Sequence, residues 1–583
     1  MKVAQRFQDF TSVLASGNYQ AAMVRAGRSL RERLLMGNYL SSSRPSSTEI
    51  LNATCGPVRG NAYQQEDGRF VDGYLGIPYA KPPVGELRFK KPEPHEIWSE
   101  PRECQKFGPR CPQNDDFFGA FVNIVGKNEA HCLTLNVFAP RWQSEEWKSG
   151  FPVMVFIHGG GFSVHSSSNY GDRTIARNLC VKDVVVVSIN YRLGILGFFT
   201  TGDDVCKGNF GLWDQTLALK WVQEHIASFG GDPKNVTIFG QSAGGASVDL
   251  LSLSPHSRDL FQRVIPMAGC GECDFAYRSN EQQATLCREY LKFIGWDGED
   301  KDTKGLLEWL KNQSTTKLEV GITPKKDFRH SQSGNLYFVP NYDGDFFPKP
   351  ISQLRKEAPK KQIMAGTTEF EGLFFVGLGG MGKNVETIRK FAKTIYKECD
   401  YGVEAGNIQN EIYEYYTKDL DPKDKEKVIQ QLVHFVGDCA INVGMYNYAK
   451  IMTELGHDVY FYSFDHFNPN GFGIFKWFLP FLGATHCIEI RYILGKGLIS
   501  KFSPDDDDRK VIHIMTTLFT NFAKYGDPNP LDGQTVWEKQ NIENPYRHLQ
   551  IKLPAPKMVE DYQARRAEFW DAIRAKNITR SSL

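Results

Sequence analysis

The stretch that most constrains the fold is a short apolar strand that runs directly into a glycine-rich bend. The strand is predicted over residues 235–239, and residues 240–245 then read Gly-Gln-Ser-Ala-Gly-Gly. Small residues on either side of Ser242 let the backbone turn sharply from a strand into a helix, which leaves the hydroxyl at the carboxyl edge of a sheet. We therefore expect Ser242 to point outward from that edge. The alternative is a glycine-rich turn that only packs a helix on a strand.

Strands and a helix alternate upstream of this bend. Residues 153–157 and 184–189 have the length and apolar composition of strands that are buried on both faces. Residues 211–228 place apolar side chains at helical spacing and end at the Phe-Gly-Gly-Asp-Pro stretch of residues 229–233. This order predicts an α/β fold with a large, mostly parallel, twisted central sheet and helices on both faces.

Size and charge limit the remaining possibilities. The 583-residue chain is long enough to fold on its own hydrophobic burial, and its 69 basic and 68 acidic residues give a net charge of +1, which disfavours nucleic acid as a partner. No apolar run reaches the roughly 18 residues of a membrane-spanning helix. Since no repeat or internal linker is visible, we expect one domain over residues 48–560, after a flexible extension over residues 1–47 and before a charged C-terminal helix and tail over residues 561–583.

A serine nucleophile needs a base, and the carbonyl that it attacks needs hydrogen-bond donors. The predicted strand at residues 153–157 ends in His-Gly-Gly-Gly-Phe. Successive glycines can turn their N–H groups into one cavity, so Gly160 and Gly161, with Ala243 after the serine, are the candidate oxyanion hole. A phosphate-binding loop is the alternative, but neither the GxxxxGK[ST] nor the GxGxxG pattern follows.

These motifs, in this order, resemble those of the type-B carboxylesterase and cholinesterase family over roughly residues 50–560. Besides the glycine loop and the bend, the resemblance depends on residues 76–85, 87–89, 133–137, 190–194, 208–215 and 229–233. It implies the α/β-hydrolase fold. It also implies chemistry that requires no metal and no organic cofactor.

The resemblance further implies the other two members of a catalytic triad, in the chain order serine, acid, histidine. The family places a glutamate before a glycine on a loop after a strand, and Glu371 matches this position, whereas Glu369 is a neighbour. The family histidine lies in a Gly-Ala-x-His-x-x-Glu pattern, which makes His486 the expected base and Glu489 a structural residue. We expect His486 to take the proton of Ser242 while Glu371 orients the imidazole, so that an acyl-enzyme forms and water hydrolyses it.

The expected activity is that of a carboxylesterase, a serine ester hydrolase acting on a small uncharged or lipophilic ester. Acetylcholine is disfavoured, because no tryptophan lies between Cys111 and Cys132 and Gln241 replaces the carboxylate that cholinesterases carry before the nucleophile. Ala268 stands where many members have a serine that supports the triad acid.

Two alternative functions stay open. One is acyl transfer to an alcohol or sugar. The other is a non-catalytic adhesion or scaffold role, although such members characteristically lose the serine or the histidine. The sequence does not specify the acyl group, the alcohol group or the oligomeric state.

The N-terminal residues and two of the cysteines bear on where in the cell the protein is expected. Charged residues interrupt any continuous apolar segment within the first 35 residues, so we expect no secretory signal and a cytoplasmic protein. The family resemblance suggests a disulfide between Cys111 and Cys132, whereas the cytoplasm would keep both as thiols, and the sequence leaves this open. Residues 36–41 match an N-myristoylation start if translation begins at Met36, which predicts a weakly membrane-attached short form as the alternative to an internal loop.

Overall fold

The computed structural model describes residues 45–115, 125–322, 328–332, 334, 336–378, 381–477, 479–497, 502–531 and 536–578. Residues 1–44, which hold the Met36 motif and most of the expected extension, lie outside this part of the chain. The myristoylated short form, the cytoplasmic location and the division at residues 47 and 560 therefore stay predictions.

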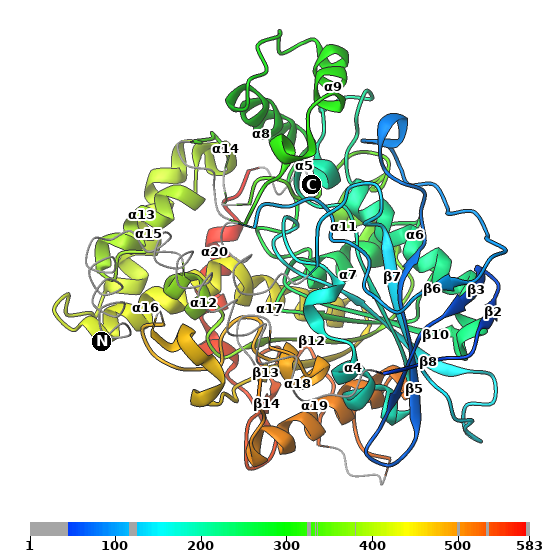
Figure 1. Ribbon diagram of the computed structural model, residues 1–583. Helices are drawn as coiled ribbons and strands as arrows, with labels where there is room; N and C mark the ends of the chain where they lie inside the picture. Colours follow the sequence, from blue (N-terminus) through cyan, green and yellow to red (C-terminus); the bar gives the residue numbers. More distant parts are fainter. Residues whose placement is uncertain are drawn as a thin grey trace, which may run out of the picture.

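A 12-stranded sheet flanked by helices forms the centre of the molecule, which confirms the predicted α/β class (Figure 1). Neighbouring strands are parallel from β9 across to β14, and antiparallel strands extend the sheet at both edges. In spatial order the strands are β1 (Ser46–Ser47), β4 (Asn61–Gln64), β5 (Phe70–Pro78), β7 (Thr134–Pro140), β9 (Val185–Ile189), β8 (Phe151–Ile157), β10 (Gly231–Gln241), β11 (Arg263–Met267), β12 (Gln362–Thr368), β13 (Asp458–Phe464), β14 (His548–Ile551) and β15 (Lys557–Val559).

A small second sheet and the helices complete the described structure. The small sheet contains β2 (Leu51–Ala53), β3 (Gly56–Arg59) and β6 (Arg102–Glu103). The α-helices are α4 (Arg173–Asn178), α5 (Gly194–Phe198), α6 (Phe210–His225), α7 (Ala243–Leu253), α8 (Asn280–Phe293), α9 (Thr303–Lys311), α10 (Thr315–Leu318), α11 (Ile351–Glu357), α12 (Glu371–Leu378), α13 (Val385–Ile395), α14 (Glu398–Tyr401), α15 (Ala405–Thr417), α16 (Lys425–Gly437), α17 (Val443–Glu454), α18 (Ile490–Leu494), α19 (Asp506–Tyr525) and α20 (Ala567–Arg574).

The elements predicted around the bend are present. The strands expected at residues 153–157, 184–189 and 235–239 correspond to β8, β9 and β10. The helix expected at residues 211–228 corresponds to α6, whose end continues as a 3-10 turn over Ile226–Phe229.

Alternation along the central strands explains why helices cover both faces of the sheet. In β8, Val153 and Val155 belong to the core cluster that also contains side chains of α6 and α7. Met154 and Phe156 belong to the opposite cluster, with side chains of α4 and α19. Because successive side chains of a strand point to opposite faces, an apolar run such as β8 requires cover on both sides.

A third apolar cluster lies beside the sheet and is formed mainly by helices. It joins α13, α15, α16 and α20, the group of helices beside the sheet in Figure 1, through buried residues such as Ile388, Leu432 and Trp570. Leu373 and Val376 of α12 belong to the same cluster. This helical block therefore fixes α12, whose first residue is Glu371.

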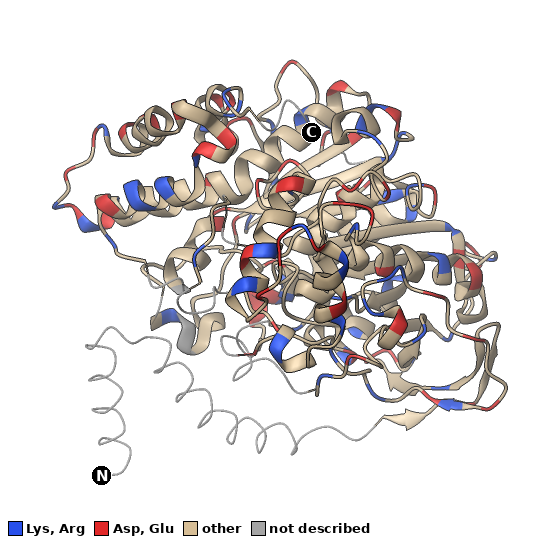
Figure 2. Cartoon of the chain, turned by 90° about the horizontal axis from the view of Figure 1, so that it is seen from above, with Lys and Arg blue, Asp and Glu red and all other residues tan. Residues whose placement is uncertain are grey.

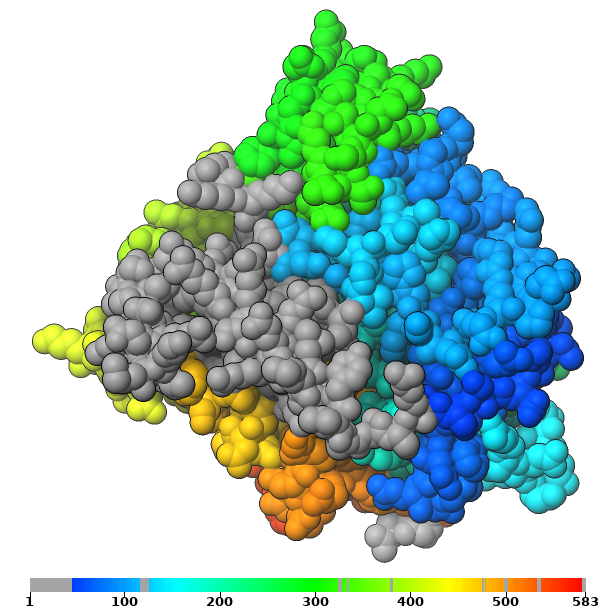
Figure 3. Space-filling model, in the orientation of Figure 1, coloured from blue at the N-terminus to red at the C-terminus, as the bar shows by residue number. Residues whose placement is uncertain are grey.

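The surface carries both signs of charge. Lys and Arg are interspersed with Asp and Glu over the cartoon in Figure 2. Helices α8 and α9 form a projection at the top of the space-filling view in Figure 3. In the described part of the chain, none of the helices combines the length and apolarity needed to cross a bilayer.

Candidate active site

Ser242 occupies the junction between β10 and α7. Its backbone has φ 59° and ψ −125°, and its N–H donates to the carbonyl of Met267 at 2.8 Å. Two glycines make this bend possible, because a Cβ at Gly244 would lie 2.1 Å from the carbonyl oxygen of Ile157, and one at Gly269 would lie 2.1 Å from that of Ser242. The strand-to-helix bend predicted at Ser242 is therefore present, and it depends on close backbone packing.

The glycine loop after β8 passes directly beside the bend. A Cβ at Gly159 would lie 2.4 Å from the carbonyl oxygen of Gln241 and 3.1 Å from Cβ of Ser242. Gly160 and Gly161 follow with φ values of 110° and 58°. Within the described residues, the N–H groups of Gly160, Gly161 and Ala243 have no hydrogen-bond acceptor. Three unpaired donors thus belong to the segments that meet at Ser242.

Glu371 and His486 are in direct contact although they come from different segments. Glu371 Oε2 lies 2.5 Å from His486 Nδ1, and Glu371 Oε1 accepts a hydrogen bond from the N–H of Thr368 at 2.6 Å. Both side chains are buried. The imidazole is flanked by the rings of Phe374 and Phe375, whose centroids lie 6.0 and 5.1 Å away.

Ser242 is not hydrogen-bonded to the imidazole. Its hydroxyl makes no hydrogen bond to any described residue, and the side-chain nitrogen Nε2 of Gln241 lies 3.2 Å from His486 Nε2. Catalytic hydrogen bonds often tighten only when substrate binds, and Ser242 remains the candidate nucleophile at the bend. The structure therefore brings Glu371 and His486 together, and it adds Gln241 to them. Sequence reasoning noted Gln241 only as a departure from the cholinesterases, and its position before Ser242 was the available clue.

Ala268 and Glu489 also bear on the surroundings of Glu371. Ala268, with φ 47°, carries no hydroxyl to hold Glu371, which has instead the N–H of Thr368. Glu489 is 1% exposed, and neither of its carboxylate oxygens has a hydrogen-bond partner among the described residues. Burial, together with the nearby charge of Glu371, raises the pKa of Glu489 well above its usual value. Burial and the neighbouring carboxylate thus favour the protonated form of the Glu489 carboxyl.

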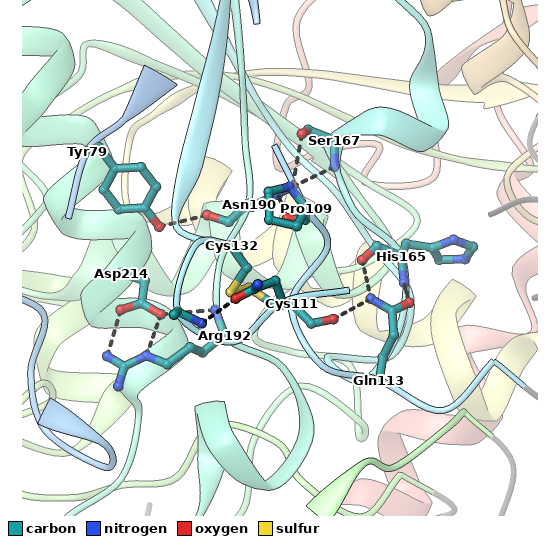
Figure 4. Close-up of a disulfide and its surroundings, with 12 residues drawn as sticks. Tyr79, Pro109, Cys111, Gln113, Cys132, His165, Ser167, Asn190, Arg192 and Asp214 are labelled. Carbon is teal, nitrogen blue, oxygen red and sulfur yellow. Dashed lines mark hydrogen bonds and ion pairs between the residues drawn. A yellow bond between two sulfur atoms is a disulfide. The ribbon is translucent and has the colours of Figure 1, made fainter. Parts of the chain in front are cut away.

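The Cys111–Cys132 pair is joined by a disulfide, drawn in Figure 4. Gln113 next to it donates through Nε2 to the carbonyls of Cys111 and His165 at 3.0 and 2.9 Å, and its Oε1 accepts from the N–H of His165 at 2.7 Å. A Cβ at Gly160 would lie 2.6 Å from Cδ2 of His165. Gln113 and His165 thus connect the disulfide to the glycine loop at Gly160. The sequence did not indicate this link.

In the described part of the chain, no group of three or more His, Cys, Asp or Glu side chains is placed to hold a metal ion. The ionisable side chains described near the bend include those of His486, Glu371, Glu489 and Cys487. A buried carboxylate that orients an imidazole is an arrangement suited to general base catalysis.

Comparison with known proteins identifies the family of the chain. A sequence model described as the carboxylesterase family matches residues 47–570. The chain is 50% identical over 549 residues to "Esterase cest-33" of Caenorhabditis elegans, covering 92% of this chain and 96% of that protein. It is 32% identical to "Juvenile hormone esterase" of Tribolium castaneum (84% and 85% covered) and 31% identical to "Cholinesterase" of Mus musculus (92% and 89% covered). The chain therefore belongs to the carboxylesterase family of α/β-hydrolases and is a carboxylesterase.

Proposed function

We propose that the protein hydrolyses carboxylic esters through an acyl-enzyme on Ser242, with His486 as the general base and Glu371 as the residue that orients it. The observation that carries the proposal is the 2.5 Å contact between Glu371 Oε2 and His486 Nδ1 next to the bend that bears Ser242. A carboxylate on Nδ1 keeps the hydrogen there and leaves Nε2 free to accept the proton of a hydroxyl.

The reaction proceeds in two halves. The oxygen of Ser242 bonds to the ester carbonyl carbon while its proton moves to Nε2 of His486, and the new oxyanion accepts hydrogen bonds from the N–H groups of Gly160, Gly161 and Ala243. The ester C–O bond then breaks, and the alcohol leaves with the proton from the imidazolium. Water attacks the acyl-enzyme along the same path and releases the acid and Ser242.

The substrate class follows from the surroundings of the imidazole. Phe374 and Phe375 flank the ring, and Gln241 is neutral. We therefore propose an uncharged or lipophilic ester. Acyl transfer to an alcohol or sugar would use the same acyl-enzyme and is distinguished by its products, because transfer makes a new ester faster than free acid. The esterase relatives favour an enzyme over the adhesion or scaffold alternative.

Labelling with a fluorophosphonate tests the proposal. The wild type is expected to gain one adduct, mapped to the peptide that contains Ser242, and Ser242→Ala is expected to gain none. Ser252→Ala is the matched control, since Ser252 lies in α7 and donates to the carbonyl of Val248 within that helix. A folded wild type that stays unlabelled at Ser242, or an equally labelled Ser242→Ala, would contradict the assignment.

A further inference from the structure

A short turn before α20 has a left-handed backbone. Within the turn Tyr562–Arg565, the three successive residues Gln563, Ala564 and Arg565 have φ values of 49°, 51° and 57°. None of them is glycine, and this conformation is unfavourable for residues that carry a Cβ. A run of this kind persists where the surrounding contacts impose it. The contacts of the turn therefore indicate what it is built to hold.

Two side chains of the turn reach the loop between β12 and α12. Oη of Tyr562, a buried residue, lies 2.8 Å from Oγ1 of Thr367. Nε2 of Gln563 donates to the carbonyl of Glu369 at 3.3 Å. The two contacts fall on the residues immediately before and after Thr368. The turn thus holds this loop on both sides of one residue.

That residue is the one that binds the candidate catalytic acid. The N–H of Thr368 donates to Oε1 of Glu371 at 2.6 Å, and Oε2 of the same carboxylate lies 2.5 Å from Nδ1 of His486. A displacement of Thr368 would therefore move the carboxylate relative to the imidazole. Misplacement of a catalytic group by a fraction of an ångström to 1 Å is enough to slow a reaction severalfold or more.

The turn is itself anchored to a second part of the molecule. Arg566, the next residue, binds the buried carboxylate of Asp438, which follows α16, through Nε and Nη2. Nη2 of Arg566 also donates to Oε1 of Gln563 at 2.7 Å. Since this bond occupies the amide oxygen, the NH₂ group of Gln563 is the end that faces the carbonyl of Glu369. The glutamine is thus oriented from one side and holds the loop on the other.

We propose that Tyr562 and Gln563 are positioning residues for catalysis, which hold Thr368 in place and through it the carboxylate of Glu371. The inference deepens the proposed function, because it rests on Glu371 being the acid that orients His486. It assigns a catalytic consequence to a turn that lies almost 200 residues after Glu371 and touches neither the imidazole nor Ser242 by any hydrogen bond among the described residues.

Steady-state hydrolysis of 4-nitrophenyl acetate tests this role. Tyr562→Phe removes the hydroxyl that contacts Thr367. Gln563→Asn shortens the side chain by one methylene, and asparagine tolerates the left-handed backbone of the turn. For each variant we expect kcat to fall by about five- to tenfold while KM stays within about twofold, since the acid is misplaced and substrate binding is not. If Tyr562→Phe does not fold, Gln563→Asn decides the test.

The same substitutions in the Glu371→Gln background separate positioning from a general structural effect. With no carboxylate to place, Tyr562→Phe and Gln563→Asn are expected to lower the residual kcat by less than about twofold. A structural effect that does not act through Glu371 would lower kcat by the same factor in both backgrounds, and that result would overturn the inference.

Ala564→Gly is the matched control. Ala564 lies in the same turn with φ 51°, and it is exposed and has no polar side-chain atom. Its kcat should equal that of the wild type. If Gln563→Asn folds, is labelled at Ser242 by fluorophosphonate and keeps the wild-type kcat, this inference is wrong while the proposed function stands. A folded wild type that is not labelled at Ser242 would overturn both.

Discussion

Glu371 Oε2 lies 2.5 Å from His486 Nδ1 although 115 residues separate the two along the chain. Backbone contacts enforce this meeting, because the N–H of Phe370 donates to the carbonyl of Ala484 at 2.8 Å. The N–H of Thr368 holds the second oxygen of Glu371, and Glu371 begins α12, where a helix favours negative charge. The carboxylate is thus fixed before any substrate arrives.

The first prediction concerns this carboxylate. Glu371→Gln keeps the shape of the side chain but can donate to Nδ1, which favours the tautomer with hydrogen on Nε2 and removes the base. We expect kcat to fall by about 10³- to 10⁴-fold. Steady-state kinetics at pH 8 measure this fall in kcat. Glu369→Gln, two residues away, is the control and should keep kcat within about twofold. A Glu371→Gln enzyme with near wild-type kcat would exclude Glu371 as the orienting acid.

The second prediction concerns the glycine loop. A Cβ at Gly160, where φ is 110°, would lie 2.3 Å from the carbonyl oxygen of Val164, so Gly160→Ala must displace the loop. We expect kcat to fall by about 10²- to 10³-fold, the effect of losing an oxyanion donor. Gly230→Ala is the control, because φ is 78° there but no atom lies within 4 Å. It should cost about 1 kcal/mol of stability and leave kcat unchanged. Unchanged kcat in Gly160→Ala would argue against this loop as the oxyanion hole.

The sequence predicted those features that local pattern determines. The buried strands β8 and β9 are almost entirely apolar, and the bend at Ser242 is flanked by small residues, so both could be expected. The contact of Gln241 with His486 could not, because it depends on how β10 and the segment before α18 pack. The same holds for the third apolar cluster, because its helices bury their apolar faces against one another and against loop residues such as Tyr396. Motif order singled out Glu371 and His486 as candidates, and the fold shows that they are in contact and what surrounds them.

The third prediction concerns the disulfide. Cys111 and Cys132 close a loop across a separation of 21 residues. Replacing both by serine should lower the free energy of unfolding by about 3 kcal/mol. Because Gln113 links the carbonyl of Cys111 to the backbone of His165, kcat should fall as well. Urea unfolding and kinetics measure the two effects. Cys399→Ser, a half-buried cysteine outside the disulfide, is the control, and equal stability in the double variant and this control would refute the prediction.

The fourth prediction concerns stability and pH at Glu369. Partial burial, and then the charge of Asp465, raises the pKa of Glu369 from 4.5 to about 7. Between these values the folded chain holds a proton that the unfolded chain has lost, so this residue lowers the free energy of unfolding as pH rises through the window. Glu369→Gln removes the penalty. We expect the variant to be more stable than the wild type at pH 8, by about 1 kcal/mol after allowance for solvent screening, and equal to it at pH 4.

Urea unfolding of both proteins at the two pH values measures this difference. Glu66→Gln, at an exposed position, is the control for the loss of one carboxyl. The difference between Glu369→Gln and the wild type must grow with pH, because only the wild type has a carboxyl that ionises at this buried position. A difference that is constant from pH 4 to pH 8 would mean that the Glu369 carboxyl titrates alike in the folded and unfolded chains.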